Sequence, residues 1–386
     1  MNLIKRHRYH IYSIRTGEEF QTGIIQAQII CEPNQPCLPI ISYLQIPLIL
    51  YPMKQLLTTI ILTLIILNIH AQPYKYLALK GGGIRGIAYT GALKVLEENN
   101  ITGGIEKVAG TSVGAIVGSL FSMGYSAKEL EDIMFNLDIG TFNDGSWFIL
   151  GGQRRMRKNY GWYKGKRLEA WIGKQIKART GNINTTFKEL HQLAQKDKKY
   201  RDLYITATNL STQKLEIFSW ETFPNLPIKV AVRASVSVPL YYGAVFLDSA
   251  GNVVSKHNKS DNYNIYVDGG IMANYPINLF TDSNSQVSKY TLGLKLERPQ
   301  QIDYRKTQKG IAPYSIHTLG NFFGAFYNIC IEQLNKGITY DEEKKNTIYI
   351  SNGNLSPRVR HISQEQKQLL YNNGYVAAKA FLSGNP

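Results

Sequence analysis

The chain has 386 residues, of which 44% are hydrophobic and 19% charged, enough apolar material for the core of one large or two ordinary domains. Its formal net charge of +16 favours an anionic partner: a membrane surface, a nucleic acid or an acidic substrate. Only one of the three cysteines, Cys330, lies beyond residue 71, which excludes a disulfide framework and a cysteine-based metal cluster from the larger part of the chain.

Residues 53–71 have the pattern of a secretory signal peptide. Lys54 supplies a short positive segment, residues 56–69 are mostly apolar, and Ala71 is a small residue suited to cleavage. The apolar run is shorter than the about 20 residues that a membrane span needs. We therefore expect a secreted or periplasmic protein that begins near Gln72. The alternative is that residues 56–69 are retained as a membrane anchor.

Residues 1–52 precede this export signal, although such signals belong at a true N-terminus. We interpret Met53 as the start of the protein and residues 1–52 as an over-extended reading frame, to which we assign no fold. Residues 72–386 contain no internal repeat and no low-complexity linker. We interpret them as one compact domain.

The first part of that domain alternates between strand and helix patterns. A short apolar run predicts a buried strand over residues 74–79, and helical spacing follows over 86–98. A second strand is predicted over 105–109, followed by a small, apolar helix over 112–123. This order predicts an α/β layered fold.

The rest of the chain continues with mixed elements. Ser126 and Glu129 form a capping-box pattern that opens a helix. Residues 139–163 lack periodicity, so we expect a loop there. Further helices are predicted over 165–178, 317–336 and 363–382, and strands over 203–210, 215–220, 265–267, 290–296 and 347–350.

Three consecutive glycines, Gly81, Gly82 and Gly83, close the first predicted strand, and Gly86 opens the following helix. Glycines leave backbone N–H groups unhindered, so this turn suits the stabilisation of an oxyanion. Arg85 projects from the same loop, where we expect it to pack and anchor the loop. The alternative is that it pairs with a carboxylate or a lipid phosphate.

The same glycines also fit the fingerprint of a dinucleotide-binding turn. That fingerprint requires an acidic residue about 20 positions on, at the end of the second strand. Glu97 and Glu98 lie within the predicted helix, and Glu106 opens the second strand. The sequence therefore disfavours a dinucleotide-binding oxidoreductase.

A serine stands between two glycines in Gly110-Thr111-Ser112-Val113-Gly114, where the second strand turns into a helix. Such an elbow exposes the serine hydroxyl at a helix N-terminus, where the helix dipole favours a developing negative charge. We therefore predict that Ser112 is a nucleophile. The alternative is that Ser112 merely caps the helix.

A nucleophilic serine needs a base, and the histidines are poor candidates. Three of the seven precede residue 72, and the other four are neither flanked by glycine nor at a strand end: His191, His257, His317 and His361. Asp268 ends a predicted strand and is followed by Gly269 and Gly270. A desolvated aspartate that is hydrogen-bonded to serine can accept its proton. The alternative is a simple Asp-Gly turn.

Together, the glycine loop, the serine elbow and the Asp-Gly-Gly turn resemble, in this order, the motifs of the patatin-like phospholipase family, here of a bacterial, exported kind. The resemblance covers about residues 74–280 and includes the block 233–239. It implies a three-layer α/β/α fold with a central, mostly parallel sheet. Lys80 departs from the aspartate that often precedes the family's glycines. Residues 281–386, a C-terminal extension, carry no motif.

The resemblance also implies an activity, the hydrolysis of acyl esters in lipids by a Ser–Asp dyad without histidine. Ser112 would attack the ester while Asp268 takes its proton, with no metal or organic cofactor. The oxyanion hole is expected at the N–H groups of the glycine loop and of Val113: Gly81, Gly82, Gly83 and Val113. The competing hypothesis is a lipid-binding or membrane-associated module that keeps the fold without turnover.

A stretch rich in basic and aromatic residues, 147–167, offers a second functional surface. Basic groups attract anionic headgroups, and Trp and Tyr settle at membrane interfaces. Stacking on single-stranded nucleic acid and a merely solvated loop are the alternatives. We expect contact with an anionic membrane and no nucleic acid, and the oligomeric state stays open. Its cations are Arg154, Arg155, Arg157, Lys158, Lys164, Lys166 and Arg167.

Overall fold

The computed structural model describes residues 74–145, 148–254, 262–307, 310–334, 345–355 and 362–384. Contacts divide the chain into two units, residues 1–69 and 70–386, and every described residue belongs to the second. The predicted signal peptide and the segment before it lie outside the described residues. Within the described ranges no helix is long and apolar enough to cross a membrane.

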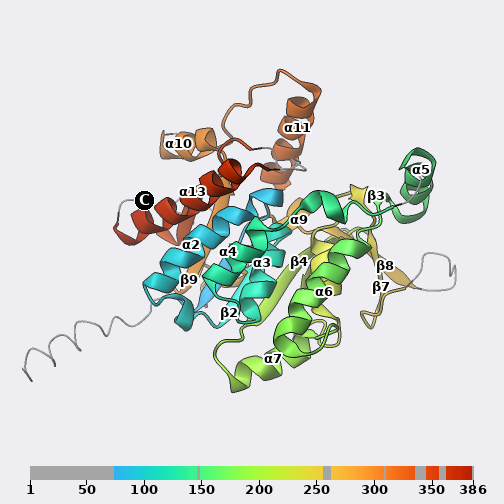
Figure 1. The fold of residues 1–386 in the computed structure, drawn as a ribbon, viewed down its shortest axis with the longest axis horizontal. Coiled ribbons are helices and arrows are strands. Elements are labelled where there is room, and N and C mark those ends of the chain that lie inside the picture. Colours follow the sequence, from blue (N-terminus) through green and yellow to red (C-terminus); the bar gives the residue numbers. More distant parts are fainter. Residues whose placement is uncertain are drawn as a thin grey trace, which may run out of the picture. The chain divides into compact units, whose positions relative to one another are not determined.

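A mixed, mostly parallel sheet lies at the centre of the second unit (Figure 1). Five strands run parallel in the order β10-β9-β1-β2-β4, and β5, β8 and β7 add antiparallel pairs beyond them. The strands are β1 (Tyr76–Leu79), β2 (Lys107–Gly110), β4 (Asp202–Asn209), β5 (Lys214–Phe218), β7 (Val245–Asp248), β8 (Tyr263–Asp268), β9 (Thr291–Glu297) and β10 (Thr347–Ser351). A separate parallel pair joins β3 (Gly161–Tyr163) to β6 (Leu240–Tyr242).

Helices connect and cover these strands. The α-helices are α2 (Ile87–Glu98), α3 (Val113–Ser122), α4 (Ala127–Phe135), α5 (Phe148–Asn159), α6 (Lys166–Thr180), α7 (Phe187–Lys196), α8 (Ile228–Ser235), α9 (Gly270–Ala273), α10 (Pro299–Thr307), α11 (Leu319–Leu334) and α13 (Gln364–Leu382). Short 3-10 turns form η1 (Gly83–Gly86), η2 (Thr102–Gly104), η3 (Ile139–Phe142) and η4 (Pro276–Leu279). The predicted capping box is confirmed at the start of α4.

Successive side chains of a strand point to opposite faces of the sheet. Different elements cover these two faces. Leu77 and Val108 lie opposite each other on β1 and β2, and both are fully buried in the core together with residues of α2 and α3. Tyr76, on the other face, stacks on Phe280, which follows η4, with 4.9 Å between ring centroids. The expected α/β fold with a central, mostly parallel sheet is confirmed.

The C-terminal extension completes this sheet and its cover. β9 lies between β10 and β1, and α13 packs along α2 (Figure 1). The two helices approach closely at glycines: a Cβ on Gly91 would lie 2.0 Å from the carbonyl oxygen of Tyr371. Residues 281–386 therefore contribute to the same core as the motifs, although they carry no motif themselves.

The expectation of a loop over residues 139–163 is wrong. This stretch contains η3, the 12-residue helix α5 and the strand β3. Two glycines, Gly151 and Gly152, weaken its helical pattern because glycine is a poor helix former. The structure gives a reason for the second one: a Cβ on Gly152 would lie 2.6 Å from the Trp162 ring, so the close packing of α5 on β3 requires glycine.

Candidate active site

The ends of β2 and β8 meet along one edge of β4. β5 pairs with Ile205–Asn209 and occupies the opposite edge, so β2 and β8 share the remaining one. On that edge Gly110 lies opposite Ile205 and Asp268 lies opposite Ala207. The antiparallel strand β8 therefore stops where the parallel strand β2 stops. Their two following turns, which carry the serine and aspartate motifs, are brought together.

Ser112 sits in a strained elbow between β2 and α3. Its backbone φ of +53° and ψ of −120° are rare for a side-chain-bearing residue. The tight turn needs glycine at Gly110, where a Cβ would lie 2.3 Å from the carbonyl oxygen of Gly114. The Ser112 side chain makes no capping hydrogen bond to α3, so the helix-cap alternative is wrong. Strain of this kind is characteristic of functional sites.

The Ser112 hydroxyl donates a hydrogen bond to Oδ2 of Asp268 at 2.9 Å. Asp268 is 2% exposed, and its other oxygen, Oδ1, accepts the N–H of Gly270 at 2.7 Å. Burial raises the pKa of Asp268 to about 6, although these two hydrogen bonds favour the ionised form. A carboxylate with such a pKa is a much better proton acceptor than a solvated aspartate, and it is still ionised at neutral pH.

Backbone donors surround the serine. Within the described residues no acceptor takes the N–H groups of Gly82, Gly83 or Val113. Val113 is the first residue of α3, where an N–H has no partner inside the helix. Gly83 adopts φ +61°, which a residue with a side chain rarely does. These three groups fit the predicted oxyanion hole, whereas the N–H of Gly81 is already bonded to the carbonyl of Asn274 at 2.9 Å.

Arg85 and Lys80 anchor the glycine loop by polar contacts. Nε of Arg85 donates to the carbonyl of Gly82 at 2.7 Å, so this side chain anchors the loop. Lys80 is buried, and its Nζ bonds Glu297 at 3.0 Å and Glu332 at 3.2 Å. Burial lowers the pKa of Lys80, but the two carboxylates outweigh it, and the pKa lies above its usual value. This departure from the family pattern therefore has a structural role.

The block 233–239 holds the site by hydrogen bonds to the backbone of both reactive residues. Oγ of Ser235 accepts the N–H of Ser112 at 2.9 Å, and the carbonyl of Ser237 accepts the N–H of Asp268 at 2.9 Å. Arg233 is buried and donates to the carbonyls of Gly165 at 3.0 Å and Gly243 at 2.8 Å. The sequence patterns predicted no role for Ser235, Ser237 or Arg233. The only signal was the resemblance of this block to the family.

The described histidines lie away from the serine. Nδ1 of His191, on α7, is 2.8 Å from Oδ1 of Asp202, which is paired with Lys107 at the amino end of β2. Ser112 follows the carboxyl end of that strand. His317 is exposed in the segment before α11. His257 and His361 lie outside the described residues. The interpretation of His191 and His317 as structural or surface residues agrees with these positions.

The remaining motif glycines terminate or start elements at the site. Gly86 ends η1, Gly114 lies in the first turn of α3, and Gly269 is the N-cap of α9. Gly110 and Gly270 close the strand end and the aspartate turn described above. All the predicted site residues are thus gathered at the carboxyl end of the parallel strands, where α/β proteins place their ligand sites.

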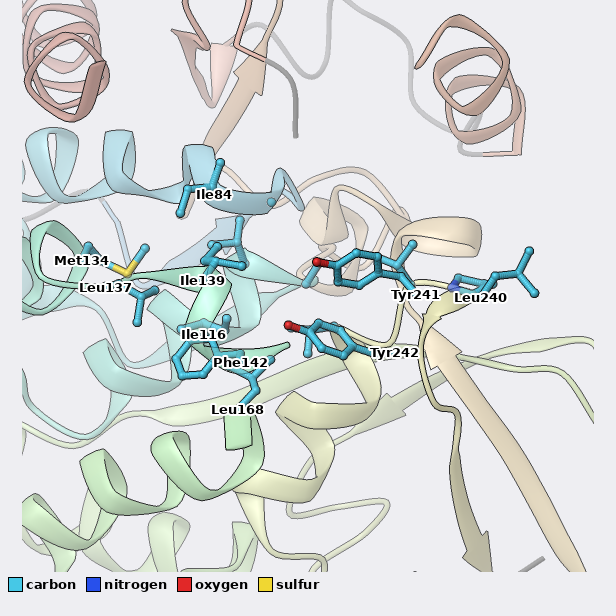
Figure 2. Close-up of a pocket in the computed structure, with 16 residues that line it drawn as sticks. Ile84, Ile116, Met134, Leu137, Ile139, Phe142, Leu168, Leu240, Tyr241 and Tyr242 are labelled. Atoms are coloured by element: carbon cyan, nitrogen blue, oxygen red, sulfur yellow. The ribbon is translucent and has the colours of Figure 1, made fainter. Parts of the chain in front are cut away.

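An apolar cavity of about 480 Å³ opens at the serine. Figure 2 shows Met134 and Leu137 at one end and Leu240 at the other. Met134 is 1% exposed and Leu240 is 65% exposed, so the cavity is closed on the side of α4 and open at β6. The wall is formed by Gly83, Ile84, Ser112, Val113, Ile116, Met134, Leu137, Ile139, Phe142, Leu168, Val236, Val238, Pro239, Leu240, Tyr241 and Tyr242.

A serine elbow on an α/β sheet, with a carboxylate and backbone donors around the hydroxyl, is typical of serine hydrolases. The family of patatin-like phospholipases matches residues 77–281, more than half of the chain. The chain belongs to this family.

The individual relatives share about a quarter to a third of their aligned residues with this chain. Uncharacterized protein R571 of Acanthamoeba polyphaga mimivirus is 34% identical over 216 residues, which cover 56% of this chain and 64% of the relative. Probable lipid hydrolase 463L of Invertebrate iridescent virus 6 is 27% identical over 220 residues, covering 56% and 66%. The chain therefore spans just under two thirds of the length of these two relatives.

Among solved structures, VipD from Legionella pneumophila is similar to this chain with a TM-score of 0.51 and 17% sequence identity. The similarity covers 81% of this chain and 67% of that one, and it supports the fold alone. Uncharacterized protein YqhO of Bacillus subtilis is 25% identical over 313 residues, covering 78% of this chain and 96% of that relative. The expectation of a bacterial, exported member of the family is not supported, because the relatives come from viruses as well as bacteria and their names say nothing of export.

Proposed function

We propose that this protein is a serine acyl hydrolase that cleaves ester bonds of lipids. The observation that carries the proposal is the 2.9 Å hydrogen bond from the Ser112 hydroxyl to the buried carboxylate of Asp268. Oγ of Ser112 attacks the ester carbonyl carbon while its proton passes to Asp268. The oxyanion accepts hydrogen bonds from the N–H groups of Gly82, Gly83 and Val113.

Collapse of the tetrahedral intermediate breaks the ester C–O bond, and Asp268 returns the proton to the leaving alcohol. Water then attacks the acyl-serine by the same route, giving up a proton to Asp268, and the free acid leaves as Ser112 recovers its hydrogen. All of these steps use residues of the chain itself.

The substrate proposed is a lipid with a fatty acyl ester, as in phospholipase A-type activity. An apolar cavity that begins at Ser112 and extends to Met134 suits an acyl chain. Transfer of the hydrocarbon chain from water to this apolar wall is favourable. Membership of the patatin-like phospholipase family supports the same substrate class. The competing proposal, a lipid-binding module without turnover, requires the same cavity but no reactive serine.

Covalent labelling separates these two proposals. We expect a fluorophosphonate to label the full-length protein at Ser112, and a soluble short-chain ester to be hydrolysed. Both signals should disappear in Ser112→Ala, because no other group replaces the nucleophile. An unlabelled, inactive wild-type protein that still binds lipid would favour the binding module.

We also propose that α5 and its surroundings contact anionic membranes. Arg154 and Lys158 are exposed on α5, and Lys164 is exposed just beyond β3. One of the expected cations does not belong to this surface. Arg155 is 9% exposed, and its Nε donates to the carbonyl of Trp162 at 2.7 Å. The expectation that the whole basic stretch faces a membrane is therefore wrong at Arg155, which joins α5 to β3.

Reversing two of the exposed charges of α5 tests this contact. Each cation contributes about 1 kcal/mol near an anionic surface, so Arg154→Glu with Lys158→Glu should weaken vesicle binding by at least about 30-fold at low salt. The effect should shrink as salt screens the charges. Vesicle co-sedimentation measures it. Lys174→Glu with Lys188→Glu, at exposed positions on α6 and α7, is the matched control. If both double variants lost vesicle binding equally, the effect would come from net charge and not from a specific contact of α5.

Export through residues 53–71 also remains a proposal, supported only by the pattern of that segment. N-terminal sequencing of the protein from its host should start near Gln72. A mature, active protein that retains residues 1–52 would contradict it.

A further inference from the structure

The open end of the cavity carries a bulky apolar residue on the surface. Leu240 is 65% exposed while it lines the cavity that starts at Ser112. Figure 2 shows its side chain at the far end from Met134, pointing away from the rest of the wall. A leucine in this position gains little from burial, so its contribution to folding is small.

The backbone at this rim is strained. Leu240 has φ +68° and Tyr160 has φ +59°, a region that bulky residues avoid. The two residues are neighbours, because the N–H of Leu240 donates to the carbonyl of Tyr160 at 3.3 Å. Tyr160 is itself 41% exposed. Strain persists only where the surroundings enforce it, and it gathers at sites that work on a ligand.

The surroundings that enforce it are the small sheet and α5. β3 and β6 pair in parallel with Gly161 opposite Leu240, and a Cβ on Gly161 would lie 2.2 Å from the backbone of Gly243. α5 packs on β3 and leads directly into Tyr160. This helix carries the exposed Arg154 and Lys158. The exposed pair and the exposed cations are therefore held together by α5 and the small sheet that packs on it.

We propose that Tyr160 and Leu240, which we call the rim pair, enter the interface of an anionic membrane and admit the acyl chain of a membrane lipid into the cavity. Apolar and tyrosine side chains settle at the boundary of headgroups and hydrocarbon, while neighbouring cations hold anionic headgroups. The cavity opens at Leu240, so an acyl chain that leaves the bilayer there reaches Ser112 along the apolar wall of the cavity. The entry of the acyl chain depends on the proposed function, whereas membrane insertion of the rim pair does not.

Substitution at Leu240 tests the insertion. Leu240→Asn and Leu240→Gly both tolerate a positive φ, so they remove the apolar side chain without straining the backbone further. Val376→Asn on α13 is the matched control, since Val376 is 64% exposed and α13 lies far from α5 in Figure 1. Binding is measured by co-sedimentation with vesicles of phosphatidylglycerol and phosphatidylcholine. A Ser112→Ala background of the full chain prevents consumption of the lipid.

We expect both Leu240 variants to bind the vesicles about tenfold more weakly and Val376→Asn to bind as the parent does. With Ser112 restored, hydrolysis of vesicle lipid should fall more than hydrolysis of a soluble short-chain ester in the same variant. Unchanged vesicle binding in the Leu240 variants would overturn the proposal, as would equal losses on both substrates. Leu240-dependent binding by a wild-type protein that hydrolyses no ester would uphold insertion and refute the proposed function.

Discussion

Replacing Asp268 by asparagine is expected to lower kcat for a soluble ester by about 10³–10⁴-fold, because a positioned general base contributes up to that much. The carboxylate that accepts the Ser112 proton is removed, while the shape of the side chain is kept. The oxygen of the new amide can still accept the N–H of Gly270, which donates to Oδ1 of Asp268 at 2.7 Å. Circular dichroism should therefore be unchanged, and fluorophosphonate labelling should slow together with turnover.

The controls for this variant are the described histidines. His191 contacts Asp202 at the amino end of the strands, and His317 is exposed before α11. His191→Gln and His317→Gln should each keep activity within a few-fold of the wild type. A loss in either variant as large as that of Asp268→Asn would mean that histidine acts as the base and that the dyad is wrong.

The pH dependence of the enzyme should report the same carboxylate. Burial raises the pKa of Asp268 to about 6, and only the ionised form can accept a proton. We expect kcat/KM to rise about tenfold per pH unit below this value and to level off above it. Initial rates on a soluble ester between about pH 4 and 8 measure the profile. A plateau that continues down to about pH 4 would show that Asp268 has an ordinary pKa and is not the base.

Protein stability should change with pH in the opposite direction. The pKa of Asp268 is about 6 in the folded protein and 3.8 in a solvated chain, so the folded state binds this proton more tightly. Its contribution to stability is present below pH 3.8 and is lost as the pH rises through 6. The difference between these two pKa values corresponds to about 3 kcal/mol of free energy of unfolding.

Asp268→Asn does not titrate and escapes this loss. Its free energy of unfolding relative to the wild type should therefore increase by about 2 kcal/mol between about pH 4 and pH 7, because part of the effect has already occurred at pH 4. Urea denaturation at the two pH values measures the difference, and all other titrating groups cancel in it. A difference that is the same at both pH values would contradict a raised pKa. An inactive variant that is more stable at neutral pH is the expected compromise between stability and catalysis.

Local patterns in the sequence were sufficient for the elements that carry the motifs. The apolar strand before Gly81 and the turn at Ser112 each depend on residues close together in the chain, so their side-chain pattern and glycines predict them directly. The same holds for the aspartate at the end of β8. The order of the three motifs resembles one family, and the matching family model confirmed that resemblance.

The C-terminal part and α5 show where local patterns fail. β9, β10 and α13 are individually predictable, but their place beside β1 and α2 depends on packing that no motif announces. α5 was missed because Gly151 and Gly152 hide its helical pattern, and the second glycine is required by the Trp162 ring. The burial of Arg155 against the carbonyl of Trp162 follows from the same packing.

The sequence by itself determined which side chains could react: a serine at a strand-to-helix elbow, an aspartate at a strand end and a glycine loop with unhindered N–H groups. Only the tertiary structure decided that Ser112 and Asp268, 156 residues apart, meet at 2.9 Å, because β2 and β8 end on the same edge of β4. It also determined the shape of the cavity, whose wall is formed by residues of helices and strands that lie far apart in the sequence. The physical reason is that strand register and helix packing join residues through the core, and such contacts leave no trace in the spacing of neighbours along the chain.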